Sequence, residues 1–286
     1  MDLTLLFLVF FILSCLTCGV MSSGSSSSIT SMFTLGDSHI DTGNAVIMAA
    51  PVIPVWIDKP PYGETFFGHP SGRFSDGRVI IDFIAEELGL PFLPAFLANS
   101  TNTSHGVNMA VGGATAIEAA FFETNGLVSF KLLNNSLDVQ LGWFVEQIRP
   151  SVCSGSGSEG REEYNRDCLG KALFFVGELG VNDYNFIWMA GKTEDEVRTY
   201  VQAEPQRGAR RPSERLSPNK TDYDHIGCLR DVNAVARYHN LLLRAAVGGL
   251  RGRHPHARII FADFYTSPSS ESSRTQAISD SPMMTF

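Results

Sequence analysis

The chain has 286 residues, of which 44% are hydrophobic and 18% are charged. This length is enough for a sizeable buried core, and the composition excludes a wholly disordered chain. The formal net charge is −8 at pH 7, so the chain has no broad basic face to neutralise the phosphates of a nucleic acid. Nucleic acid is therefore not expected as a partner.

The first 24 residues are typical of a secretory signal peptide. An almost unbroken apolar run at 3–20 passes into small residues at 21–25, which suit cleavage by signal peptidase. Asp2 stands where a basic residue is usual, and an uncleaved anchor is the alternative interpretation. No later stretch reaches 18 apolar residues, so we expect no stable membrane span after the signal is removed.

Apolar runs of strand length alternate with helical patterns along the rest of the chain. Strands are expected at 29–35, 107–111, 172–176 and 258–261. Helices are expected at about 78–88, from Ser136 onward, and at about 229–247, where Gly248 and Gly249 would end the last one. The apolar side chains expected on one face of the second helix are Leu137, Leu141, Phe144 and Ile148. Strands separated by helices indicate βαβ units and hence a parallel sheet covered on both faces.

Sequons and cysteines agree with a secretory route. The acceptor residues are Asn99, Asn102, Asn134 and Asn219. Each sequon needs the secretory lumen and an exposed loop to be used. Without the signal peptide three cysteines remain, and Cys153 and Cys168 flank a Gly/Ser/Glu-rich loop that a short disulfide could close. Cys228 would then be unpaired or bridged to something outside this chain.

Polar residues follow three of the expected apolar runs, namely Ser38, Gly112 and Asn182. The carboxyl ends of parallel strands meet at one edge of a sheet, so we expect these residues to gather there. A serine at such a junction presents its hydroxyl to the crevice, and its own N–H is free to bind an oxyanion. The alternative is a serine that only caps the following helix.

Four segments resemble the GDSL esterases and lipases of the SGNH hydrolase superfamily, specifically the plant secreted branch. They are residues 36–44, 62–67 with 72–78, 108–114, and 175–184, in the family's order. The resemblance runs from about 31 to 201 and resumes from 216 to 266. It implies a three-layer α/β/α domain at 29–266 with a parallel, flavodoxin-like sheet. It also implies a protein secreted to the cell wall or apoplast.

The resemblance further implies a carboxylic ester hydrolase that acts through an acyl-serine intermediate on a small-molecule or lipid ester, with no cofactor and no metal. Ser38 would be the nucleophile and would also supply one oxyanion N–H. Gly112, through its N–H, and Asn182, through its side-chain amide, would be the other two donors. Asp41 and Asp183 are expected to fix loop geometry rather than to do chemistry.

The family's C-terminal Asp-x-x-His motif, which supplies the catalytic base, is missing. Asp222 and His225 match its letters but precede the long helix, well upstream of the family's position. Family sequence is also lost at 202–215, expected to be a solvated loop, and at 267–286, expected to be a disordered Ser-rich tail. The first loss includes the Pro-x-Gly-Cys-x-Pro cysteine that would pair with Cys228. Both breaks are typical of altered exon joining or a misread gene model.

This chain is therefore expected to have impaired activity. A non-catalytic secreted protein that keeps the ester-binding crevice is the alternative. A second rival comes from Asp37-Ser-His39, which resembles the Asp-x-His metal pair that opens metallophosphoesterases. Their Gly-Asp-x-x-Asp and Gly-Asn-His-Glu-type segments do not occur here, so a two-metal site would lack its ligands.

Overall fold

The computed structural model describes residues 29–50, 56–98, 102–128, 133–153, 168–193, 196–197, 219–225, 227–261 and 263. Four predictions fall outside these residues: the signal peptide at 1–24, the acceptor Asn99, the loop at 202–215 and the tail at 267–286.

A parallel sheet lies at the centre of the described residues. Its strands are β1 (Ser31–Leu35), β2 (Gly106–Asn108) and β3 (Ala172–Val176), in the order β2-β1-β3. Both pairings are parallel, and Phe33 of β1 lies between Val107 of β2 and Phe174 of β3. The parallel sheet is as predicted, and this strand order is the one that opens a flavodoxin-like sheet.

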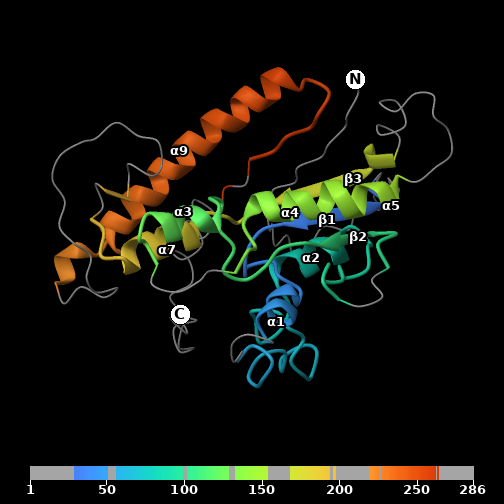
Figure 1. Ribbon diagram of the computed structural model, residues 1–286, viewed down its shortest axis with the longest axis horizontal. Helices are drawn as coiled ribbons and strands as arrows, with labels where there is room; N and C mark the ends of the chain where they lie inside the picture. The colour runs from blue at the N-terminus through green and yellow to red at the C-terminus, as the bar shows by residue number, and fades with distance from the viewer. Residues whose placement is uncertain are drawn as a thin grey trace, which may run out of the picture.

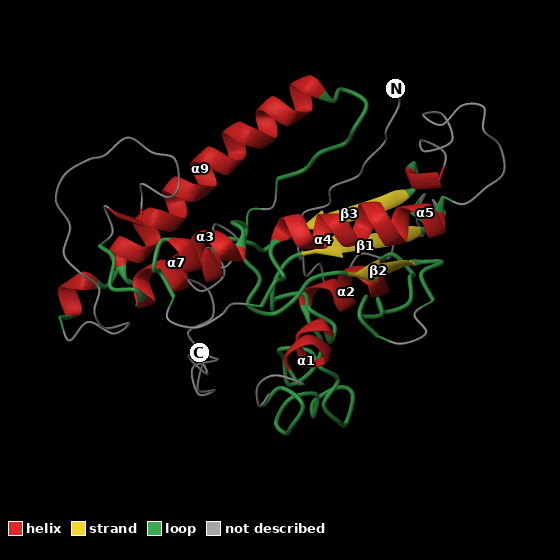
Figure 2. Cartoon of the chain, viewed as in Figure 1, coloured by secondary structure: helices red, strands yellow, loops and turns green. Residues whose placement is uncertain are grey.

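Helices cover both faces of the sheet because alternate side chains of a strand point to opposite sides. Met32 packs in one apolar cluster with Ile81 and Ile84 of α2 (Ile80–Glu87). Phe33 packs in another with Phe144 and Ile148. These two belong to a continuous helical stretch made of α4 (Leu137–Trp143), the π-helical turn η1 (Phe144–Ile148) and α5 (Arg149–Val152). Figures 1 and 2 show this stretch running alongside the strands, and the expected α/β layering is confirmed.

Three of the remaining helices form a third apolar cluster, away from the sheet. Phe122 of α3 (Ala119–Thr124), Ile187 of α7 (Val181–Met189) and Val235 of α9 (Arg230–Arg253) pack together. The three helices are neighbours in Figure 1. The short helices α1 (Asn44–Ala49) and η2 (Lys220–Asp222) complete the described elements. Among the described residues, no helix is both long enough and apolar enough to cross a membrane.

The predicted strand at 258–261 is wrong. Residues 259–261 are irregular and lie against α9, where the Arg251 Nε donates to the Ile259 carbonyl at 2.7 Å and the Arg244 guanidinium stacks over the Phe261 ring at 4.6 Å. Helix α9 also continues through Gly248 and Gly249, where we expected it to end, as far as Arg253. A glycine inside a helix costs only about 1 kcal/mol, so neighbouring helical residues can carry the helix across the pair.

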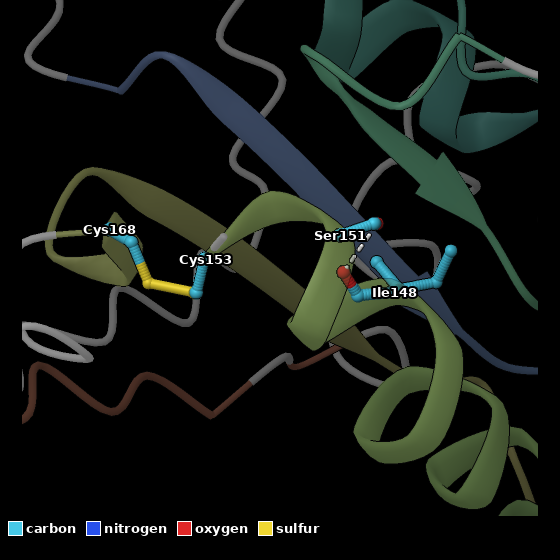
Figure 3. The surroundings of a disulfide bond; sticks show 4 residues. All are labelled: Ile148, Ser151, Cys153 and Cys168. Atoms are coloured by element: carbon cyan, nitrogen blue, oxygen red, sulfur yellow. Dashed lines mark hydrogen bonds between the residues drawn. A yellow bond between two sulfur atoms is a disulfide. The ribbon is translucent and has the colours of Figure 1, made fainter. Parts of the chain in front are cut away.

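The disulfide between Cys153 and Cys168 is confirmed. The two Cα atoms are 5.6 Å apart, and the bond ties the residue after α5 to the segment that leads into β3. Figure 3 shows the bond beside the last turn of the helix, where the Ser151 hydroxyl donates to the Ile148 carbonyl at 2.8 Å. Cys228 is exposed and free.

Candidate active site

Ser38 lies in the turn that follows β1, as predicted. The side chain is half-buried, and its hydroxyl makes no hydrogen bond to any described residue. Gln140 of α4 fixes the turn, because its side chain accepts from the Gly36 N–H and donates to the Gly36 carbonyl, both at 2.9 Å. The serine is therefore held at the carboxyl edge of the sheet with its hydroxyl available.

Asp41 joins the serine turn to the segment after β2. Its carboxylate accepts from the N–H groups of Gly43, Asn44 and Ala45 at 2.7, 2.7 and 3.0 Å, and from the Gly112 N–H at 2.8 Å. Burial raises the pKa of Asp41 to about 6, while the four N–H donors oppose that shift. The predicted role of Asp41 in loop geometry is confirmed.

Asn44, the first residue of α1, adds a second set of buried bonds. Its side-chain Nδ2 donates to the carbonyls of Asn108 and Ala110, each at 2.9 Å, and its Oδ1 accepts from the Leu97 N–H at 2.9 Å. The end of β2 is therefore bound to the loop after Ser38 by side chains rather than by strand pairing.

The two glycines after β2 have different environments. The N–H of Gly112 is committed to Asp41, and a Cβ at Gly112 would overlap the Phe74 ring. Gly113 is exposed, has a φ of 82°, and its N–H has no partner among the described residues. The Gly112 N–H cannot bind an oxyanion while it is bonded to Asp41, so the neighbouring Gly113 N–H is a second candidate donor, and the role of Gly112 stays a prediction. The two consecutive glycines could be identified in the sequence, but the hydrogen bond from the Gly112 N–H to Asp41 could not.

Asn182 approaches the serine turn from α7. Its Nδ2 donates to the Ala114 carbonyl at 2.9 Å and to Asp37 Oδ2 at 3.2 Å. Next to it, Asp183 accepts from the N–H groups of Ala116 and Ile117, each at 2.9 Å. The glycine turn and the start of α7 are thus joined as the sequence predicted, and Asp183 fixes loop geometry. Burial raises the pKa of Asp183.

Glu178, which was not among the predicted site residues, follows β3 at the same edge of the sheet. The Nδ1 of His39 lies 3.0 Å from Asp37 Oδ1 and 3.1 Å from Glu178 Oε2. The hydrogen bond with Asp37 is the main cause that raises the pKa of His39 to about 8. The only signal for Glu178 was its position directly after a predicted strand and its glycine.

All seven histidines of the chain lie in the described residues, and none of them is hydrogen-bonded to Ser38. His239, on α9, pairs through Nδ1 with the Tyr184 hydroxyl at 2.8 Å, and burial lowers the pKa of His239. His225 is exposed in a turn, and Asp222 accepts from the Asn219 side chain at 3.4 Å. The site therefore has a serine and amide donors without a histidine at the hydroxyl.

The serine turn, the glycine turn and the start of α7 meet at the carboxyl edge of a parallel α/β sheet, where ligand sites form in this class of fold. The family model for GDSL-like lipases and acylhydrolases matches residues 32–281. The chain belongs to this family, whose members are hydrolases acting on ester bonds. The matched range includes 202–215 and passes residue 266, where we expected the domain to end.

Plant relatives agree with this assignment. GDSL esterase/lipase At1g28590 of Arabidopsis thaliana is 39% identical over 91% of this chain and 70% of its own length. GDSL esterase/lipase At1g28580 of the same plant is 40% identical over 83% of this chain and 66% of its own length. GDSL esterase/lipase At1g28570, also of Arabidopsis thaliana, is 36% identical over 90% of this chain and 72% of its own length.

We expect Gly112→Ala to destabilise the protein by about 1–3 kcal/mol, the usual cost of overpacking a filled site. The added methyl group would collide with the Phe74 ring, so Phe74→Leu in the same chain should recover part of the loss. Gly142→Ala is the matched control, because a Cβ there meets open space on a helix and should stabilise by up to about 1 kcal/mol. Urea unfolding measures all three variants. Equal stability of the two Gly→Ala variants would contradict the packing role.

Proposed function

We propose that Ser38 is the nucleophile of an ester hydrolase and forms an acyl-serine intermediate with a small-molecule or lipid ester. Its hydroxyl oxygen attacks the ester carbonyl carbon, which becomes tetrahedral and places negative charge on the carbonyl oxygen. The N–H groups of Ser38 and Gly113 and the amide of Asn182 then stabilise this oxyanion. The alcohol leaves with a proton, and water releases the acid in a second, similar step.

The observation that supports this proposal is the convergence of the serine turn, the glycine turn and α7. Asp41 joins the first two by its bond to Gly112, and Asn182 bonds to both Asp37 and Ala114. Preorganised donors cost no reorganisation when charge develops, which is why such a frame favours acyl transfer.

The same proposal includes impaired turnover in this chain. A serine hydroxyl is a weak nucleophile until a base takes its proton, and none of the seven histidines is bonded to Ser38. The competing function is a non-catalytic protein that binds esters in the same crevice. The two differ in whether Ser38 can form a covalent bond.

A serine-directed aryl phosphonate tests the nucleophile. We expect slow covalent labelling of the full chain at one residue, identified as Ser38 by peptide mass spectrometry, with no labelling of Ser38→Ala. Ser71→Ala is a matched control, because Ser71 lies outside the serine turn. Labelling that persists in Ser38→Ala would contradict the serine mechanism, and a chain that stays unlabelled over days would favour the non-catalytic protein.

We also propose that the protein is secreted to the cell wall or apoplast and glycosylated. Asn102, Asn134 and Asn219 are exposed, as an acceptor must be, and the disulfide is typical of an oxidising compartment. Expression in plant cells should give extracellular protein whose mass falls on glycosidase treatment. Cytosolic protein of unmodified mass would contradict this proposal.

A further inference from the structure

Three side chains with metal-ligating atoms converge beside the serine turn. They are Asp37 and His39, on either side of Ser38, and Glu178 after β3, and each offers one ligand atom within 4.8 Å of the others. The His39 Nδ1 faces two carboxylate oxygens, at 3.0 and 3.1 Å. A ring nitrogen carries at most one hydrogen, which can point straight at only one of them.

The distances among these atoms suit a small metal ion. Zinc binds nitrogen and carboxylate oxygen at about 2.0–2.2 Å in a tetrahedron, which places neighbouring ligand atoms about 3.3–3.5 Å apart. The two nitrogen–oxygen distances are within a few tenths of an ångström of that spacing. The third pair of ligand atoms, the carboxylate oxygens of Asp37 and Glu178, lies within 4.8 Å, and the partly exposed side chain of Glu178 can move to shorten that distance.

The surroundings orient one ligand and leave access to the others. Asp37 is fully buried and is held by the His39 N–H at Oδ1 and by the Asn182 amide at Oδ2. Such outer hydrogen bonds are what fix the direction of a metal ligand. The side chains of His39 and Glu178 are 51% and 41% exposed, so an ion can enter and keep a water in its fourth position.

The charge of the cluster also suits a dication. Two carboxylates meet one imidazole, and within the described residues the ion pairs of Asp37 and Glu178 are made with His39 alone. A protonated imidazole can balance only one of the two carboxylate charges. A divalent ion would balance both charges.

We propose that Asp37, His39 and Glu178 bind one divalent transition-metal ion, with zinc favoured by the mixed imidazole and carboxylate ligands. This site is distinct from the two-metal centre that the sequence excluded, because it needs one ion and takes its third ligand from the loop after β3. The ion would bridge the loops after β1 and β3 beside the nucleophile. The proposal does not depend on ester hydrolysis.

Zinc binding by the full-length, disulfide-bonded chain tests the site. The probe is ZnCl₂ in competition with a chromophoric chelator, in a Cys228→Ser background that removes the exposed thiol. We expect one zinc per chain, and His39→Gln and Glu178→Gln should each weaken binding more than about 10- to 100-fold, the loss typical of an outer-sphere partner. His69→Gln, at an exposed histidine elsewhere, should bind zinc unchanged.

Thermal unfolding gives a second readout, because an ion that binds only the folded state raises its stability. Saturating zinc should raise the Tm of the Cys228→Ser protein and of His69→Gln but leave that of His39→Gln unchanged. No stoichiometric binding, or binding that His39→Gln and Glu178→Gln leave intact, would overturn the proposal. Magnesium that competes equally with zinc would also overturn it, since magnesium prefers all-oxygen sites.

Discussion

Replacing Asp41 with alanine should lower the free energy of unfolding by about 3–5 kcal/mol, because a buried donor left without an acceptor costs about 1–3 kcal/mol. Four backbone N–H groups, of Gly43, Asn44, Ala45 and Gly112, would lose their acceptor. Each is buried, so water cannot replace the carboxylate without opening the loops. The serine turn and the glycine turn should separate as a result.

Denaturant unfolding with the disulfide intact measures this change. Asp41→Asn should be less damaging than Asp41→Ala, because its remaining oxygen can still accept some of these bonds. Asp58→Ala is the matched control: Asp58 is exposed, and a substitution there should stay within about 0.5 kcal/mol. A loss below about 1 kcal/mol in Asp41→Ala would show that the carboxylate does not hold the two turns together.

The sheet could be predicted from the sequence because its signal is local. Continuous apolar runs marked β1 and β3, and βαβ alternation implied parallel pairing, as the structure confirms. The expected apolar face of the helix after Ser136 was only partly correct. Leu141 is 44% exposed, whereas Gln140 beside it is fully buried and bonds to Gly36 and Asn135. Hydrophobic periodicity cannot show that a polar side chain will find all its partners in the core.

The site was predicted as a set of residues but not as a set of bonds. Ser38 and Asn182 could be placed at one edge because strand ends meet there, and short-range patterns identified Asp41 as a loop residue. The occupation of the Gly112 N–H depends on a carboxylate from another loop. The contact between His39 and Glu178 likewise joins segments that are distant in the sequence.

Helix α9 was predicted as a helix, but its burial was not. Among its described residues only Val235 is buried, and Leu241 is 63% exposed.

The second large effect concerns turnover. This chain should hydrolyse a short-chain aryl ester about 10⁴- to 10⁶-fold more slowly than a serine hydrolase with its base, the cost of removing a triad base. Its oxyanion donors should retain about 10³-fold over the uncatalysed reaction. Ser38→Ala should remove the part of this residual rate that passes through the acyl-serine intermediate. Burst-phase kinetics on the full chain would measure that part. A chelator in the assay would exclude effects of metal ions.

His225 decides whether this expectation is correct. It is exposed in a turn before α9, and an effective base must reach the serine proton directly or through one water. His225→Ala should therefore leave the faint rate unchanged, as should the control His254→Ala, at an exposed residue after α9. Robust turnover lost in His225→Ala alone would identify Asp222 and His225 as the missing pair, because only a group that takes the serine proton would act so selectively. Robust turnover that Ser38→Ala leaves intact would instead place the chemistry outside the serine turn.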